Sequence, residues 1–269
     1  MKKGIQRIVV AVLAVALTMT MFPLPAFAAE GDTGAAPSRN AGSHAKRTIL
    51  LYDCGSNLET EAGLATYNLM QILESRFSSD DDIRFLVMTG GSHKWQIDEQ
   101  KLVFPAEVTL PEDAVIPYDS DNRKYTDESA DPKSQVSNIY NQIWEAKGID
   151  ATLENGEKDP NAGKMVLLDG DGITGAENTA VKSEDELMSD PETLKAFINY
   201  GAAKYPADKY DLILWDHGGG PKGGFGSDDH RDDLNDWSIP SVMSFGGIIE
   251  ALADNAVTNT DADGDGKKD

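Results

Sequence analysis

The sequence predicts an α/β fold in which a parallel sheet carries helices on both faces. Three consecutive segments support this: an apolar run at residues 48–52, a helical pattern of apolar residues over 64–77, and a second apolar run at 83–88. Each run ends in turn-forming residues, at 53–57 and 89–91. Strand, helix and strand in this order are typical of a right-handed crossover between parallel strands.

Residues 1–28 are predicted to be a secretory signal peptide. Lys2, Lys3 and Arg7 form a basic start, residues 8–21 are apolar, and the small residues around Phe27 predict cleavage near Ala28. The alternative for this segment is an uncleaved membrane anchor. Residues 29–46 are polar and aperiodic, which indicates a flexible lead-in. We therefore expect a secreted protein with one domain over residues 47–269, and no later stretch is apolar enough to span a membrane.

The composition excludes several classes of partner and scaffold. The 269-residue chain has a formal net charge of -22, and loss of the basic leader makes it more negative. This charge disfavours nucleic acid and anionic membranes as partners. The single cysteine, Cys54, excludes an internal disulfide framework, so burial alone must hold the core together.

The elements after residue 91 are predicted in the following order. Residues 101–104 and 164–168 are short strands, with a polar loop over 118–135 and a short helix over 140–146 between them. Pro191 after Asp190 marks the first turn of the next helix, whose apolar face includes Leu194 and Phe197. A strand over 210–215 and a last helix over 241–253 complete the pattern.

The strand at 210–215 ends in Asp216 and His217, and glycines follow at 218–220. Active residues of open α/β sheets lie at the carboxyl ends of the strands. An imidazole at that edge can act as a general base, and glycine amides can approach a substrate oxygen closely. The local sequence alone fits a solvent-facing histidine at a strand end equally well.

Four segments resemble, in the same order, the motifs of the clostripain-like cysteine peptidases (family C11). They are residues 52–59, 89–95, 189–198 and 205–220, and the resemblance covers roughly 47–253. It implies a caspase-like α/β fold and cleavage of peptides or proteins by a Cys–His dyad, often after a basic residue. By the same resemblance, His217 matches the catalytic histidine, and Gly218 matches the glycine whose amide helps to hold the oxyanion.

The sequence departs from this family at the nucleophile. In the family, the nucleophilic cysteine lies on the strand that follows the histidine strand, and no such strand occurs within these 269 residues. Cys54 lies in the first-strand motif instead and is predicted to be a half-buried, small apolar residue. We therefore expect a domain truncated before the nucleophile strand, inactive alone, with an exposed sheet edge. The alternative is a catalytically inert fragment or an acidic calcium-binding exported module.

Two further histidines are candidate site residues. His93 could line the same sheet edge as His217, but an exposed loop histidine is the favoured interpretation. His230 lies among Asp228, Asp229, Asp232 and Asp233, which could bind a cation, although an exposed acidic loop is the commoner reason for such a cluster. Trp95 is predicted either to line a substrate groove or to cover the sheet edge.

The segment after His217 contains two candidate sites of self-processing. Clostripain-like peptidases cut themselves between the histidine and the cysteine, and Lys222 and Arg231 are the basic residues between Gly218 and Gly266. Glycines around Lys222 are expected to keep this loop accessible.

The last residues match the first half of a calcium-binding loop. Asp261, Asp263 and Asp265 stand at positions 1, 3 and 5, and Gly266 stands at position 6. The closing glutamate would lie beyond residue 269, so chance and an exposed polar loop remain alternatives to a calcium site. Residues 169–172 repeat part of this pattern and are interpreted as a turn.

Overall fold

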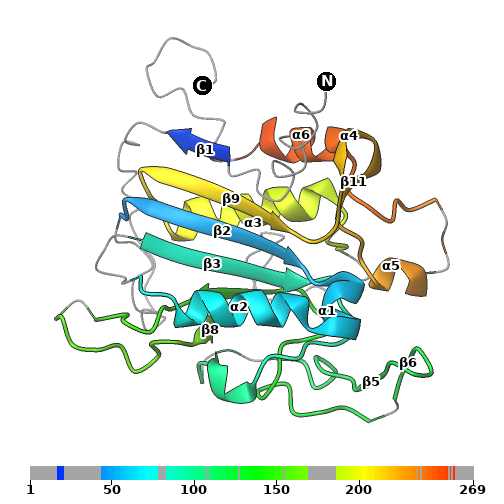
Figure 1. Ribbon diagram of the computed structural model, residues 1–269, viewed down its shortest axis with the longest axis horizontal. Coiled ribbons are helices and arrows are strands. Elements are labelled where there is room, and N and C mark those ends of the chain that lie inside the picture. Colours follow the sequence, from blue (N-terminus) through cyan, green and yellow to red (C-terminus); the bar gives the residue numbers. More distant parts are fainter. Residues whose placement is uncertain are drawn as a thin grey trace, which may run out of the picture.

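The computed structural model describes residues 44–77, 83–168 and 186–257, apart from positions 107, 109, 127, 154, 235, 237, 254 and 256, and also the strand β1 (Leu17–Thr20). A seven-stranded sheet has the order β1-β9-β2-β3-β7-β8-β4, and helices cover both of its faces (Figure 1). The predicted α/β class is confirmed, and the architecture is consistent with a caspase-like fold. Within the described ranges, no helix is both long and apolar enough to cross a membrane.

Three parallel strands form the centre of the sheet. They are β2 (Arg47–Cys54), β3 (Ile83–Gly90) and β9 (Lys209–Trp215), and β2 lies between the other two. All three were predicted from apolar runs that end in turn residues. The register places Asp53 of β2 beside Thr89 of β3 and Trp215 of β9, so the carboxyl ends of the strands meet at one edge.

The outer strands make the sheet mixed. β7 (Gln142–Ala146) runs antiparallel to β3, β8 (Met165–Leu167) runs antiparallel to β7, and β4 (Leu102–Val103) is parallel to β8. The strands expected at 101–104 and 164–168 are confirmed. The helix expected at 140–146 is wrong, because this segment pairs with β3 as a strand. The polar loop at 118–135 contains a small hairpin, β5 (Tyr118–Asp119) and β6 (Lys124–Tyr125).

One face of the sheet is covered by α1 (Ser56–Ala62) and α2 (Leu64–Glu74), and the other by α3 (Pro191–Lys204) and α6 (Phe245–Ala253) (Figure 1). Ala65, Leu69 and Leu73 recur every four residues on α2 and are buried, because this spacing forms one apolar stripe. The side chain of Asp190 caps α3 by accepting a hydrogen bond from the backbone N–H of Glu192 at 2.9 Å. The predicted start of this helix is therefore confirmed.

Strand β2 contributes to two separate hydrophobic cores. Leu50, Tyr52 and Cys54 are buried with residues of α3, whereas Leu51 is buried with residues of α2. Successive side chains of a strand point to opposite faces, so both layers of helices depend on this one strand.

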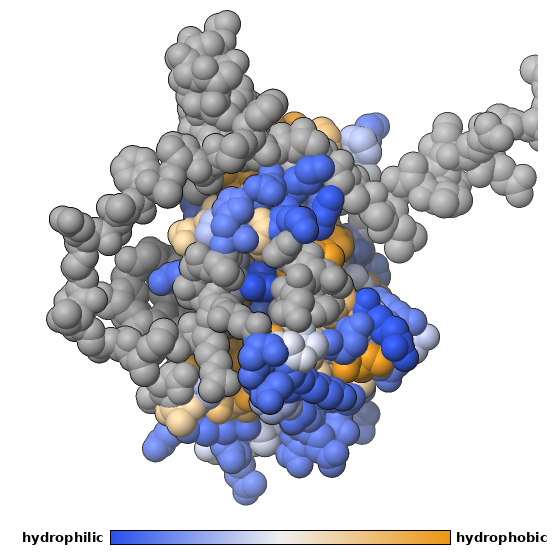
Figure 2. All heavy atoms as spheres, turned by 90° about the vertical axis from the view of Figure 1, so that its left-hand side faces the viewer, coloured by the Kyte–Doolittle hydropathy of each residue, from blue (hydrophilic) through white to orange (hydrophobic). Residues whose placement is uncertain are grey.

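Strand β1 lies along the outer edge of β9. Leu17–Thr20 pair antiparallel with residues 209–212 of β9. These residues fall within the predicted signal peptide, and the edge of β9 that was expected to be exposed is paired in this structure. Figure 2 shows the end of the molecule where the central strands begin, and hydrophilic side chains dominate its described surface. The carboxyl ends of these strands lie at the opposite end.

The segment after β9 folds into short elements. They are β10 (Gly218–Gly219), α4 (Gly220–Gly223), β11 (Gly224–Phe225) and α5 (His230–Asp233). Elsewhere in the chain, the short 3-10 helix η2 (Glu99–Lys101) precedes β4. β10 and β11 pair as an antiparallel hairpin. Phe225 is also bridged to the buried Met243, which anchors the hairpin beside α6.

Candidate active site

His217 lies two residues beyond β9 and is exposed at the carboxyl edge of the sheet. Its Nε2 atom is 3.1 Å from Oδ1 of Asn57, which is in the first turn of α1. Because β2 leads directly into α1 and pairs with β9, residues 160 positions apart in the sequence meet at this edge (Figure 1). His217 therefore lies at the rim of the sheet, where the sequence predicted it.

The carboxylate of Asp216 organises the turn that carries His217. Its Oδ1 accepts hydrogen bonds from Oγ of Ser56 at 2.8 Å and from the backbone N–H of His217 at 2.5 Å. Its Oδ2 accepts one from the backbone N–H of Ser227 at 2.7 Å. Burial raises the pKa of Asp216, and these hydrogen bonds oppose that rise because they favour the carboxylate. The side chain thus joins three segments at the site.

Ser56 has an unusual backbone conformation at the start of α1. Its φ is 46°, a left-handed value that costs a non-glycine residue about 1–3 kcal/mol. Ser56 is fully buried, and its hydroxyl bonds to Asp216. Strained residues of this kind persist where the surrounding contacts determine them, and they cluster at functional sites.

Gly218 is exposed in the hairpin that follows the histidine. It pairs with Phe225, and the next residue, Gly226, donates its backbone N–H to the carbonyl oxygen of His217 at 2.9 Å. The hairpin therefore fixes the backbone on the carboxyl side of His217. Gly218 directly follows His217 in the chain, and an oxyanion-binding role for its amide stays a prediction.

Cys54 is fully buried at the end of β2, as a packed apolar residue would be, and not half-buried as predicted. Its thiol donates to the carbonyl oxygen of Ser227 at 3.4 Å. A Cβ atom on Gly91 would lie only 2.8 Å from its sulfur. Burial raises the pKa of Cys54, and the nearby carboxylates of Asp216 and Asp228 raise it further. A thiol in this environment is neutral and poorly nucleophilic.

The prediction that His93 and His230 lie in exposed loops is wrong. His93 is 7% exposed and bonds to Oδ2 of Asp233 through Nε2 at 2.9 Å, and its ring stacks on Tyr118. His230 is 5% exposed. Its two ring nitrogens contact Asp228 Oδ1 at 2.9 Å and the carbonyl oxygen of Asn138 at 2.8 Å. Asp228 is a near neighbour of His230 in the sequence, but Asn138 and Tyr118 come from other segments, and nothing in the local sequence indicates them.

This histidine pair packs the segment after His217 against the loop after β3. The rings of His93 and His230 are 5.2 Å apart, edge to face. Asp228 is also buried and accepts the backbone N–H of Met188 at 2.6 Å, whereas Asp232 and Asp233 are exposed. The acidic cluster is therefore divided between the interior and the surface.

The structure separates the two candidate processing residues. Lys222 is exposed in α4. Arg231 is 8% exposed, and its Nε donates to the carbonyl oxygen of Ile239 at 3.1 Å. Trp95 is buried in the core on the α2 side of the sheet.

The predicted calcium ligands Asp261, Asp263 and Asp265 lie outside the described residues, as does the turn at 169–172. Among the residues that are described, no group of three or more His, Cys, Asp or Glu side chains could hold a metal ion.

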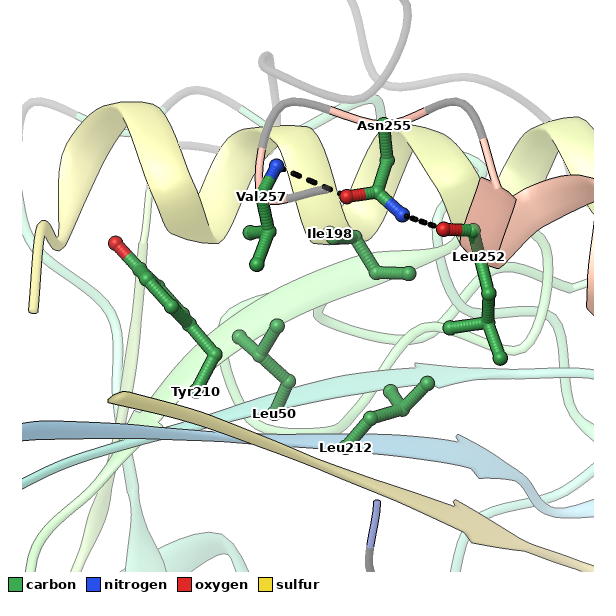
Figure 3. A pocket seen from close by; sticks show the side chains of 7 residues that line it. All are labelled: Leu50, Ile198, Tyr210, Leu212, Leu252, Asn255 and Val257. Atoms are coloured by element: carbon green, nitrogen blue, oxygen red, sulfur yellow. Dashed lines mark hydrogen bonds between the residues drawn. The ribbon is translucent and has the colours of Figure 1, made fainter. Parts of the chain in front are cut away.

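A small cavity of about 30 Å³ lies away from this edge, between the sheet and the helices α3 and α6 (Figure 3). The cavity is lined mostly by apolar side chains, from Leu50, Ile198, Tyr210, Leu212, Leu252, Asn255 and Val257. The amide of Asn255 is occupied by the carbonyl oxygen of Leu252 and the N–H of Val257, each at 2.9 Å. The cavity is a packing defect of the core, and the histidine edge remains the candidate site.

The sequence assigned no role to three residues of the site. Asn57, Ser56 and Asp216 stand in turn-like clusters at the ends of β2 and β9. Polar residues that follow two neighbouring parallel strands meet at one edge, and this was the signal that could have identified them.

Comparison with known proteins agrees with the resemblance found in the sequence. The sequence model of the clostripain family matches residues 134–229, a range that contains Asp216, His217 and Gly218. Clostripain from Hathewaya histolytica is 57% identical over 35 residues. This match covers 13% of the present chain and 7% of the length of clostripain.

Proposed function

We propose that this chain, whose residues 134–229 match the clostripain family, is the histidine-bearing part of a secreted cysteine endopeptidase of the clostripain type. The position of His217 carries this proposal. It stands exposed at the carboxyl edge of the sheet, on a turn fixed by Asp216 and beside the glycine hairpin. The arrangement suits an acid–base group for acyl transfer.

The proposed reaction is hydrolysis of a peptide bond through a thioester. A cysteine thiolate attacks the scissile carbonyl carbon, and the protonated His217 donates a proton to the departing amine. His217 then takes a proton from water as that water attacks the thioester, which releases the carboxylic acid and restores the cysteine thiolate beside the protonated histidine. The amides near Gly218 are proposed to stabilise the oxyanion in both steps.

The nucleophile in this proposal is a cysteine other than Cys54. Cys54 is buried and its pKa is raised, so it cannot present a thiolate to a substrate. Since Cys54 is the only cysteine among the 269 residues, the nucleophile is proposed to lie outside them. The preference for Arg or Lys at the cleaved bond is proposed from the resemblance alone.

The test uses the full-length protein from its source genome and fluorogenic peptides with Arg, Lys, Ala or Asp before the cleaved bond. We expect thiol-dependent cleavage that is fastest after a basic residue. His217→Ala should lower kcat/KM by about 10²- to 10⁴-fold, which is the usual contribution of a general acid–base group. His44→Ala, at an exposed histidine bonded to Asp208, is the matched control and should retain activity. Equal activity of the His217 variant and the wild type would overturn the proposal.

Secretion is proposed from the leader-like residues 1–28. Amino-terminal sequencing of the protein from culture medium should begin at Ala29. Protein that stays in the cells with residues 1–28 attached would contradict this.

A calcium site is proposed at Asp261, Asp263 and Asp265 from their spacing. Calorimetric titration of the full-length protein with calcium chloride should show a site that Asp263→Asn weakens. Calcium binding without any thiol-dependent cleavage would favour the acidic calcium-binding module instead of the peptidase.

A further inference from the structure

We propose that Asn57 is a positioning residue that holds His217 with its ring proton on Nε2, so that Nδ1 is the nitrogen that exchanges protons during catalysis. The inference rests on the proposed function and adds to it the atom that does the chemistry.

The contact between the two side chains determines the tautomer. Oδ1 of Asn57 lies 3.1 Å from Nε2 of His217. An amide oxygen can only accept a hydrogen bond, so Nε2 must carry the proton. In a neutral imidazole the other nitrogen then has a free lone pair. The contact therefore assigns Nδ1 as the base and proton donor.

The local backbone brings Asn57 to this position. The preceding residue, Ser56, has the left-handed φ of 46° at the junction of β2 and α1. Its hydroxyl is bonded to Asp216, and the same carboxylate accepts the N–H of His217. The strained residue thus fixes the start of α1 and the end of β9 relative to each other. Asn57 directly follows Ser56 and His217 directly follows Asp216, so the bonded pair holds their backbones near each other.

The exposure of Asn57 argues against a role in stability. Its side chain is on the surface at the same edge as His217, and Ser56, directly before it, is fully buried. Hydrogen bonds between exposed side chains contribute little to folding, because water replaces the lost partner. We therefore expect loss of the Asn57–His217 contact to change the protonation of the imidazole and to leave the stability of the fold nearly unchanged.

The neutral charge of Asn57 also matters. An amide orients the ring without adding a negative charge beside it. A carboxylate at the same position would favour the doubly protonated imidazolium, because opposite charges stabilise each other. Asn57→Ala therefore removes the orienting hydrogen bond, whereas Asn57→Asp keeps an acceptor and adds a negative charge beside the ring.

The first experiment reads the tautomer without using activity. In the full-length protein with ¹⁵N-labelled histidine, the His217 ring signals are identified by their loss in His217→Gln. At a pH where the ring is neutral, we expect the Nε2–H form in the wild type and a mixture of both forms in Asn57→Ala. Asn155→Ala, at an exposed asparagine bonded to Glu157, is the matched control and should leave the signals unchanged. An Nδ1–H form in the wild type, or an unchanged tautomer in Asn57→Ala, would overturn the inference.

The second experiment is kinetic. Asn57→Ala should lower kcat by about 10- to 100-fold, part of the usual acid–base contribution, and leave KM and the unfolding midpoint unchanged. Asn57→Asp should move the alkaline limb of the pH profile of kcat/KM toward higher pH, because the added carboxylate keeps His217 protonated, and a merely structural role would not do this. If Asn57→Ala lowered the unfolding midpoint together with kcat, the result would count against a positioning role.

The two experiments also separate this inference from the proposed function. An active wild-type protein with the other tautomer would overturn the inference alone. An inactive wild-type protein that shows the Nε2–H form would overturn both the peptidase assignment and the catalytic meaning of the contact.

Discussion

The hydroxyl of Ser56 donates a hydrogen bond to Oδ1 of Asp216 over 2.8 Å and so joins the ends of two adjacent strands, β2 and β9. Ser56 is fully buried and strained, and Asp216 accepts two further backbone N–H groups. This single contact holds the two segments from which Asn57 and His217 project.

Asp216→Ala should destabilise the protein by about 2–4 kcal/mol, because it leaves a buried hydroxyl and two backbone N–H groups without their acceptor. Urea unfolding followed by tryptophan fluorescence measures this difference. The control is Glu61→Ala, which removes an exposed carboxylate on α1 and should change the free energy of unfolding by less than about 0.5 kcal/mol. Equal effects of the two variants would show that Asp216 does not organise the turn.

Cys54 should resist alkylation in the native protein, because its thiol is buried and its raised pKa keeps it neutral. Mass spectrometry of the peptide that contains Cys54, after iodoacetamide treatment with and without urea, measures this. Cys54→Ala should keep peptidase activity in the full-length protein. If activity disappears while the fold is intact, Cys54 is the nucleophile and the proposed reaction needs revision.

His230 should make stability depend on pH. Burial by itself lowers the pKa of His230, but the hydrogen bond and the charge of Asp228 outweigh it and raise the pKa above the ordinary 6.5. The folded state therefore binds this proton more tightly than the unfolded state. The stabilisation is fully present below pH about 6.5 and is lost as the pH rises through the higher, folded-state value.

His230→Gln should remove this dependence. Urea unfolding between pH about 5 and about 9 should show the largest difference from the wild type at the acid end and a smaller one at the alkaline end. Asp232→Asn, at an exposed neighbouring carboxylate, should keep the wild-type slope. A difference that grows with pH would mean that the His230 site favours the neutral ring.

Lys222 should be the faster of the two cleavage sites for an external protease. It is exposed, whereas Arg231 is buried and bonded to the carbonyl oxygen of Ile239. Brief trypsin digestion with mass spectrometry should detect cleavage after Lys222 before cleavage after Arg231, and urea should abolish the difference. Earlier cleavage after Arg231 in the native protein would refute this order and would also favour Arg231 as the self-processing site.

Gly224→Ala should distort the hairpin next to His217. Gly224 has a φ of 73°, and an added Cβ would lie 2.2 Å from the carbonyl oxygen of Met243. Strain and overlap together should cost about 2 kcal/mol or more. Gly223→Ala is the matched control, because nothing lies within 4 Å of its added Cβ. Thermal unfolding should show a clear loss for Gly224→Ala only, and similar values would indicate that the hairpin adapts.

The central strands were predictable because each is an apolar run that ends in turn residues, and α3 was predictable because Asp190 and Pro191 mark its start. The helix expected at 140–146 failed for a physical reason. Ile143 and Trp144 are both fully buried, on opposite faces of the sheet, and short apolar runs of this kind fit a helix or a strand equally well. Pairing with β3 decides between them.

At the site, local sequence sufficed to place His217 and Gly218 at the edge of the sheet, since both follow an obvious strand. It did not suffice for His93 and His230, whose burial depends on Tyr118 and Asn138 from other segments. A histidine among aspartates looks like a surface loop until its distant partners are known. Long-range packing of this kind has no periodic signature in a single sequence.

Because β2 supplies side chains to both hydrophobic cores, its amide hydrogens can exchange with solvent only when both layers open together. They should be among the slowest to exchange in the molecule. Asn57 and Ser56 follow the last residue of this strand after a single glycine, Gly55. The side chains around the imidazole are thus attached to a part of the chain that we expect to open last, and this keeps their geometry fixed.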